Sequence, residues 1–141
     1  YMLLCLLGGA MTLFKPITDK KASKKVKKIF NIIKKKRKIK FIPNFWRMIA
    51  NDPSTLERTW NTLSQIMKKG SLDPLTKEML YIAVSMTNSC EYCIRSHTAA
   101  AKKKGMTDKM LKELIAVVGM ANETNKLVES YQVEVDSFLK K

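Results

Sequence analysis

The chain has 141 residues, of which 45% are hydrophobic and 28% are charged. This is the length of one domain with enough apolar material for a core, which excludes a disordered, collagen-like or low-complexity chain. No apolar run reaches the roughly 18 residues of a membrane-spanning helix, so no span is predicted. Three cysteines are too few, and odd in number, for a secreted disulfide scaffold.

The net charge of +15 is concentrated in the first third of the chain. Residues 1–50 hold 14 Lys or Arg and one acid, whereas residues 51–141 hold 13 Lys or Arg and 11 acids. A nucleic-acid domain usually carries its charge where its fold is. Most of this chain is therefore an ordinary, nearly neutral globular sequence, and we expect no nucleic-acid partner.

The N-terminal segment is apolar but lacks the basic stretch that precedes the core of a signal peptide. We interpret Met11 as a natural start. Residues 1–13 are predicted to be an extension that is disordered or not native, and Cys5 receives no role. A single domain is predicted over residues 14–141.

The first predicted helix, residues 22–38, combines an apolar stripe with a lysine-rich surface. The stripe consists of Val26, Ile29, Phe30 and Ile33, which follow the helical spacing. We interpret the lysines as a solvated face, because no aromatic residues interleave them. Contact with an anionic surface is the alternative.

Two further helices are predicted before residue 71. Asn44 is expected to cap a short helix over residues 45–51. Asp52 followed by Pro53 is a helix-start signal, and that helix is expected to stop at Gly70. Its apolar face would carry Leu56, Trp60, Leu63, Ile66 and Met67.

Asp73 and Pro74 repeat the start signal, and the helix that follows is almost entirely apolar after Glu78. A helix that is apolar all round is predicted to be buried. Residues 87–89 then interrupt the pattern. Asn88 is predicted to cap a new helix that runs from about residue 89 to residue 104.

The last third of the chain is predicted to form two more helices. One begins at Thr107 or Asp108, and the other runs from about Gly119 to Leu139. No segment alternates with period two for long enough to be a strand. The predicted fold class is all-α, with about six to seven helices.

Two of the three cysteines and the single histidine lie within eight residues, in the order Cys90, Cys93 and His97. On a helix these spacings put all three on one face. An i, i+3 cysteine pair in a first turn can close a disulfide with little backbone movement. The pattern indicates thiol redox chemistry, in which a thiolate attacks and a second thiol forms the disulfide.

Placing Asn88 at the cap puts Cys90 at the second helical position, where the partial positive charge of the helix favours a thiolate. His97 can accept a thiol proton or donate one to a leaving oxygen. Glu78 lies 12 residues before Cys90. If the chain folds back at residues 87–89, Glu78 faces this surface, and a buried carboxylate needs a partner such as His97.

The pattern of Glu78, Cys90, Cys93 and His97 resembles the alkyl hydroperoxidase D-like, or carboxymuconolactone decarboxylase-like, family. The segments FIPNFWRMIANDP and TLFKPIT are similar to its peroxidase-related members, and the resemblance spans about residues 12–136. It implies a compact all-α fold that assembles into homo-oligomers, trimers or hexamers, with a thiol peroxidase or disulfide-reductase site.

The resemblance also implies residue roles. Cys93 would attack the peroxide, Cys90 would resolve the product, and Glu78 with His97 would relay protons. The helix argument favours Cys90 as the more acidic thiol, but His97 is four residues from Cys93, so the family assignment is followed. The founding peroxidase has histidine where this chain has Tyr92, and a phenol is a poor base at neutral pH. Tyr92 is kept as a further relay residue.

Several alternatives remain at this point. The cysteines and His97 could bind zinc with Glu78 as a fourth ligand, although three ligands on one helix face give a strained tetrahedron. The thiols could also be inert. A decarboxylase-type lyase on the same fold and a non-enzymatic basic binding module are the other function classes. The lyase branch does not depend on a cysteine pair, and salt-dependent binding would test the module.

The predicted activity is a cytoplasmic antioxidant peroxidase of the peroxiredoxin type. Its partners would be a hydroperoxide substrate and a thiol or dithiol reductant, either a protein or a lipoyl-type group. No cofactor and no metal are predicted.

Overall fold

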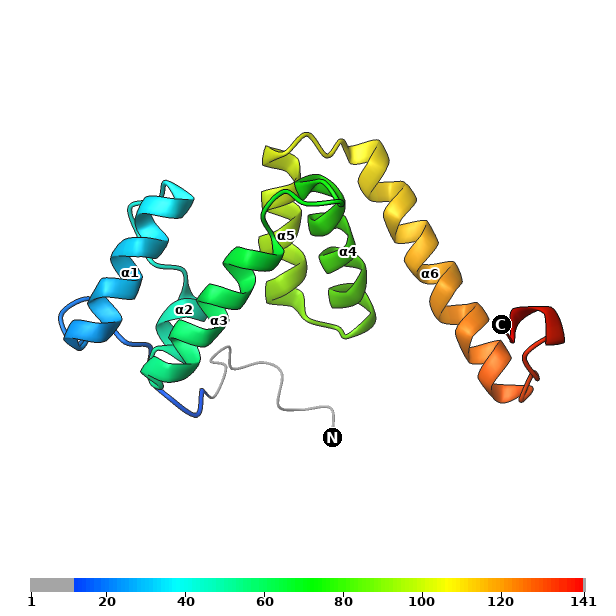
Figure 1. Cartoon of the computed structure of the whole chain (residues 1–141), viewed down its shortest axis with the longest axis horizontal. Helices are drawn as coiled ribbons and strands as arrows, with labels where there is room; N and C mark the ends of the chain where they lie inside the picture. The colour runs from blue at the N-terminus through cyan, green and yellow to red at the C-terminus, as the bar shows by residue number, and fades with distance from the viewer. Residues whose placement is uncertain (1–11, 141) are drawn as a thin grey trace, which may run out of the picture. The chain divides into compact units, whose positions relative to one another are not determined.

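The structure, a computed structural model, describes residues 12–140, and this part of the chain is helical with no strand (Figure 1). This confirms the predicted all-α class. The elements are α1 (Lys24–Arg37), α2 (Asn44–Ile49), α3 (Pro53–Ile66), α4 (Pro74–Thr87), α5 (Glu91–Lys103), α6 (Asp108–Ser130) and the short 3-10 helix η1 (Ser137–Leu139). The extension predicted up to residue 13 lies mostly outside the described residues, as does Cys5. Among residues 12–140, no helix is long and apolar enough to cross a membrane.

The chain forms two compact units, one ending at Ile66 and the other beginning at Met67. The single domain predicted over residues 14–141 stays a prediction, and each unit is described by itself.

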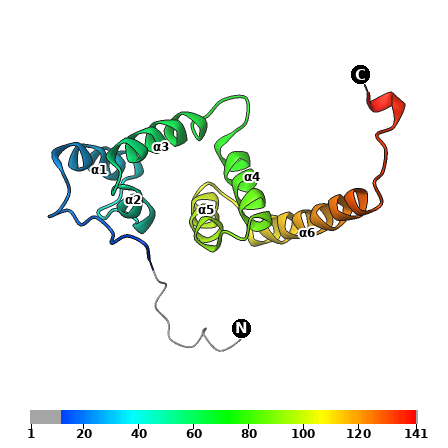
Figure 2. The same cartoon turned by 90° about the horizontal axis from the view of Figure 1, so that it is seen from below.

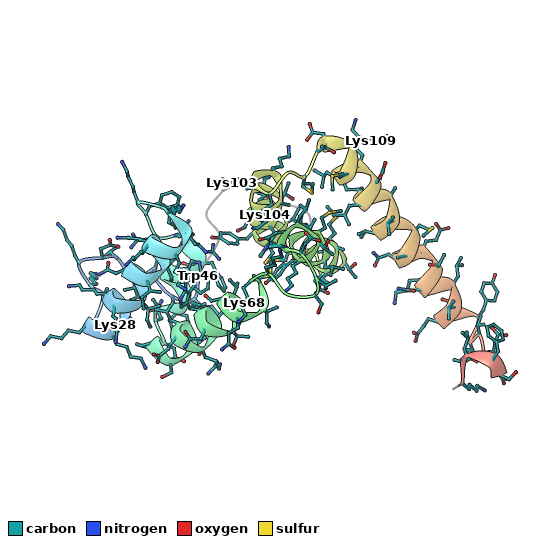
Figure 3. The ribbon with its side chains drawn as sticks, turned by 45° about the horizontal axis from the view of Figure 1, so that its top comes forward. Lys28, Trp46, Lys68, Lys103, Lys104 and Lys109 are labelled. Carbon is teal, nitrogen blue, oxygen red and sulfur yellow. A yellow bond between two sulfur atoms is a disulfide. The ribbon has the colours of Figure 1, made fainter. Side chains whose placement is uncertain are left out.

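The core of the first unit lies where α3 meets α1 and α2. Ser23 accepts a hydrogen bond from the Val26 backbone and so caps α1. The predicted apolar stripe of α1 is buried, which confirms that face. Trp46 and Trp60 are also buried, with ring centroids 5.3 Å apart in an edge-to-face arrangement. Figure 3 shows Trp46 among the helices and Lys28 on the outer side of α1.

Two boundaries in this unit differ from the prediction. Asn44 is the first residue of α2 rather than its cap, because extended Pro43 precedes the helix and supplies no side-chain cap. α3 ends at Ile66, before Gly70. Gly70 instead belongs to a loop, in which its backbone N–H donates to the Leu72 carbonyl at 3.3 Å.

The second unit is built on α4, which contacts both α5 and α6 (Figure 2). Asp73 caps α4 by accepting from the Leu75 and Thr76 backbones, as its start signal predicts. The core has Ile82, Ala101 and Met106 at its centre. Leu75, Met79, Met86, Met110, Leu111 and Leu114 pack against them.

The prediction of two separate helices after residue 107 is wrong. Thr107 caps one continuous helix, α6, which passes through Gly119 and ends at Ser130. A glycine inside a helix costs only about 1 kcal/mol, which flanking residues offset when no proline or cap stops the helix. The second half of α6 extends past α4 and α5 (Figures 1 and 2).

The prediction that α4 is buried is also wrong within a single copy of the chain. Leu80 and Val84 are 52% and 59% exposed, because α5 and α6 cover only part of the helix surface. An apolar face of α4 therefore stays uncovered within the unit.

Candidate active site

The cysteine pair sits where the chain turns back between α4 and α5. Ser89 has a left-handed backbone with φ of 54°, and this conformation reverses the chain. The Cys90 backbone N–H donates to the Ser85 carbonyl of α4 at 2.9 Å. Cys90 itself is the N-cap of α5, so the prediction that Asn88 caps this helix is wrong. The local reason is that Asn88 still ends α4, with its backbone N–H bonded to the Val84 carbonyl.

Cys90 and Cys93 form a disulfide, with Cα atoms 5.3 Å apart. Cys93 occupies the third position of α5, because the helix begins at Glu91. Both sulfur atoms therefore belong to the first turn, where unsatisfied backbone N–H groups favour a thiolate once the bond is reduced. Both residues are partly exposed. The premise that Cys90 occupies the second helical position is therefore wrong, since Cys90 is the N-cap of α5.

Glu78 and His97 are joined directly. The chain reversal lets α5 run back along α4 (Figure 1). Glu78 Oε2 lies 2.6 Å from His97 Nδ1. Glu78 is only 5% exposed. Glu78 and His97 therefore lie next to each other, as expected from the sequence. His97 is the partner that the buried carboxylate requires.

Two further residues complete this cluster, and the sequence analysis missed both. Lys104 Nζ donates to Glu78 Oε1 at 2.7 Å. The Tyr81 ring stacks on the His97 ring, with centroids 3.6 Å apart and planes 18° apart. Their spacings in the sequence could have indicated both residues. Tyr81 is three residues from Glu78 on α4, and Lys104 is seven residues from His97 on the α5 side, so each lies on the same helix face as its neighbour.

The electrostatics of Glu78 follow from these contacts. Burial raises the pKa of its carboxyl group, but hydrogen bonds and charge from His97 and Lys104 lower it more. The net result is a pKa below the ordinary value of 4.5. Glu78 is therefore a carboxylate at neutral pH.

The structure also bears on Tyr92 and on the zinc alternative. Tyr92 is 45% exposed, and the link from Glu78 to His97 does not pass through it. In the described part of the chain, no three His, Cys, Asp or Glu residues cluster in a way that could hold a metal ion.

Comparison with known proteins decides the family. The model of the carboxymuconolactone decarboxylase family matches residues 53–133. This chain belongs to that family. The match includes all of α4 and α5, so it contains Glu78, both cysteines of the disulfide, His97 and Lys104.

Within the family, the chain is AhpD-like. The crystal structure of an alkylhydroperoxidase AhpD core from Rhodospirillum rubrum is 44% identical in sequence, with a TM-score of 0.88. The match covers 94% of this chain and 99% of that one.

Similarity to curated proteins is more limited. An alkyl hydroperoxide reductase AhpD from Solibacter usitatus is 29% identical over 51% of this chain and 39% of its own length. An uncharacterised protein of the cox locus in Paracoccus denitrificans is 29% identical over 45% of this chain and 59% of its own length. The aligned region is thus well short of the full length of these relatives.

Proposed function

We propose that this protein is a thiol-dependent peroxidase and disulfide reductase that reduces hydroperoxides with the Cys90–Cys93 pair. One observation carries the proposal. The helix that begins at this disulfide also carries His97, whose imidazole is hydrogen-bonded to the buried carboxylate of Glu78. The names of the Rhodospirillum and Solibacter relatives support it.

The reaction starts from the reduced pair. The Cys93 thiolate attacks one oxygen of the hydroperoxide, the O–O bond breaks, and the leaving oxygen takes a proton to become an alcohol. Cys93 is now a sulfenic acid. The Cys90 thiol attacks it, a disulfide forms and water leaves. An external thiol or dithiol reductant then supplies two electrons and two protons to restore both thiols.

His97 is the proposed general base and acid for these transfers, and Glu78 holds the imidazole from its Nδ1 side. Cys93 is assigned the attack because it lies one helical turn before His97. Cys90 precedes α5 and is assigned the resolving role. Tyr92 is retained as a further relay residue, with a hydroxyl that can donate or accept.

The proposal includes a cytoplasmic location, because thiol reductants there would return the Cys90–Cys93 disulfide to two thiols. It also includes a homo-oligomer. Leu80 and Val84 of α4, together with Val117 and Met120 of α6, are each more than half exposed, and a second copy would cover them.

Thiol counting with cysteine variants tests the function. The reduced chain has three thiols, including Cys5. One equivalent of hydroperoxide should leave one thiol in the wild type and none in Cys5→Ser, the matched control. Cys93→Ser should not react, whereas Cys90→Ser should react once and leave a sulfenic acid at Cys93. His97→Ala should slow the reaction by about 10²–10⁴.

The thiol counts test both the roles of the two cysteines and the peroxidase function. A reactive Cys93→Ser paired with an inert Cys90→Ser would reverse the two roles. An unchanged thiol count in the wild type would rule out the peroxidase.

A lyase acting on a lactone acid is the second candidate, because the matching family model carries the decarboxylase description. Release of CO₂ from a carboxymuconolactone, unaffected in Cys90→Ser, would favour it.

A further inference from the structure

Lys104 contacts the one acidic side chain that is buried among residues 12–140. Its Nζ atom lies 2.7 Å from Glu78 Oε1, while His97 Nδ1 lies 2.6 Å from Glu78 Oε2. Each carboxylate oxygen therefore has its own partner. The lysine side chain is 36% exposed and the glutamate side chain 7%, so the stem of Lys104 leads from the surface to an interior charge.

The position of Lys104 at the end of α5 brings about this contact. Lys104 is the C-cap residue of the helix, with its backbone N–H on the Ala101 carbonyl. Gly105 follows with φ of 99° and turns the chain away. Figure 3 labels Lys103 and Lys104 at this end of the helix.

The neighbouring lysines show that this contact is specific to one of three consecutive residues. Lys102 pairs with Asp108, and both side chains are more than half exposed, so water screens this pair. Lys103 is exposed, and no hydrogen bond or ion pair of its side chain is present in the described part of the chain. Only Lys104 reaches a carboxylate that water cannot screen.

The Glu78 carboxylate needs a partner whose positive charge stays constant while His97 gains and loses a proton. An imidazole that accepts and donates protons is cationic for only part of the cycle, whereas an ammonium stays cationic. When His97 is neutral, a buried Glu78 carboxylate without Lys104 would have no compensating charge and would tend to take up a proton.

We propose that Lys104 is a positioning residue for the peroxidase relay: it holds the Glu78 carboxylate ionised and in place so that Glu78 can orient His97. This rests on the proposed function. The other side chains near Glu78 fit this division of roles. Tyr81, on the same helix, stacks on His97, and α6 adds the apolar residues Met110, Leu111 and Leu114 to this core.

The test uses the full chain with Lys104→Met, the charge-retaining Lys104→Arg, and Lys103→Met as a matched control. Lys104→Gln keeps a donor without the charge, and it replaces Lys104→Met if that variant does not fold. The first measurement is the titration of the Glu78 carboxyl carbon by NMR in ¹³C-labelled protein. The second is the rate of thiol oxidation by a hydroperoxide as a function of pH.

In Lys104→Met and Lys104→Gln, the pKa of Glu78 should rise, because burial then acts with less compensation. The acid limb of the pH–rate profile should move to higher pH, with about a tenfold loss of rate near pH 5 and a smaller loss near pH 8. Lys104→Arg and Lys103→Met should behave like the wild type.

A Glu78 titration that is the same in Lys104→Gln and Lys103→Met would overturn the role of Lys104. So would a uniform loss of rate at every pH, since that indicates a merely structural contact. A wild-type chain that does not oxidise its thiols would instead overturn the proposed function. The NMR titration separates the two failures because it needs no turnover.

Discussion

At the scale of single residues, Glu78 is the centre of the candidate site. It is buried, it carries a negative charge at neutral pH, and two cationic or basic partners on the α5 side satisfy its oxygens. Such a carboxylate is expected to affect folding as well as the proposed proton relay. Its lowered pKa links the stability of the protein to pH.

The sign of this linkage follows from the direction of the shift. Because the pKa of Glu78 lies below 4.5 in the folded chain, its stabilising effect is present above about pH 4.5 and disappears as pH falls through the folded value. Glu78→Gln should remove this part of the pH dependence. Urea unfolding at pH 7 and at about pH 3.5 should show a smaller difference in unfolding free energy for the variant.

Asp19, Asp52 and Asp73 also have lowered pKa values, mainly through hydrogen bonds from Lys34, Thr55 and Thr76, so the wild type keeps some acid sensitivity after the change. The informative quantity is therefore the difference between wild type and variant. An identical pH dependence in both would show that Glu78 is not linked to stability.

At the scale of elements, the turns around α5 determine which residues meet. The left-handed Ser89 reverses the chain before the helix, and Gly105 turns it afterwards. Together they align α5 along α4, so that Glu78 meets both His97 and Lys104. Gly105 and Gly119 differ in their roles: Gly105 turns the chain after α5, whereas Gly119 lies inside α6.

Replacing these two glycines by alanine should change stability in opposite directions. At Gly105, an added Cβ meets no atom within 4 Å, but φ of 99° strains any L side chain, so Gly105→Ala should destabilise by about 1–2 kcal/mol. At Gly119, the added Cβ also meets nothing within 4 Å. Its place inside α6 means that Gly119→Ala should stabilise by about 1 kcal/mol.

Thermal or urea unfolding measures both changes, and each variant serves as the control for the other. Equal effects of the same sign would contradict the assignment of Gly105 to the left-handed turn.

At the scale of the whole molecule, the second unit leaves a large apolar surface uncovered. α6 has no buried residue, and Val117, Met120 and Val128 are each more than half exposed. Exposed apolar surface of this kind is typical of protein–protein interaction sites. It fits the proposed homo-oligomer.

Acidic substitutions on α6 should therefore break the assembly. Val117→Asp combined with Met120→Asp would put buried, unpaired charges in the interface, which costs several kcal/mol. Light scattering after size-exclusion chromatography should give a smaller particle than the wild type. Asn125→Asp, at an exposed polar position of the same helix, is the control. A wild-type chain that elutes as a monomer would contradict the proposal.

Local sequence signals were sufficient for much of the fold. The apolar stripe of α1, the start of α4 at Asp73 and the cap of α6 at Thr107 depend on contacts within one or two turns, which the sequence displays directly. The pattern of Cys90, Cys93 and His97 depends in the same way on helical spacing. Glu78 was found because a lone carboxylate in an apolar helix needs a partner.

Other features depended on tertiary structure. Asn88 has the residue type of an N-cap, yet it ends α4, because the reversal at Ser89 moves the start of α5 to Glu91. Gly119 has the residue type of a helix stop, yet α6 continues, since the cost of one glycine is small. In the sequence, Lys104 is the last of three consecutive lysines, Lys102 to Lys104. Its spacing from His97 puts it on the same helix face, but only the packing of α5 along α4 gives it a buried partner, and the energy of an ion pair depends on that burial.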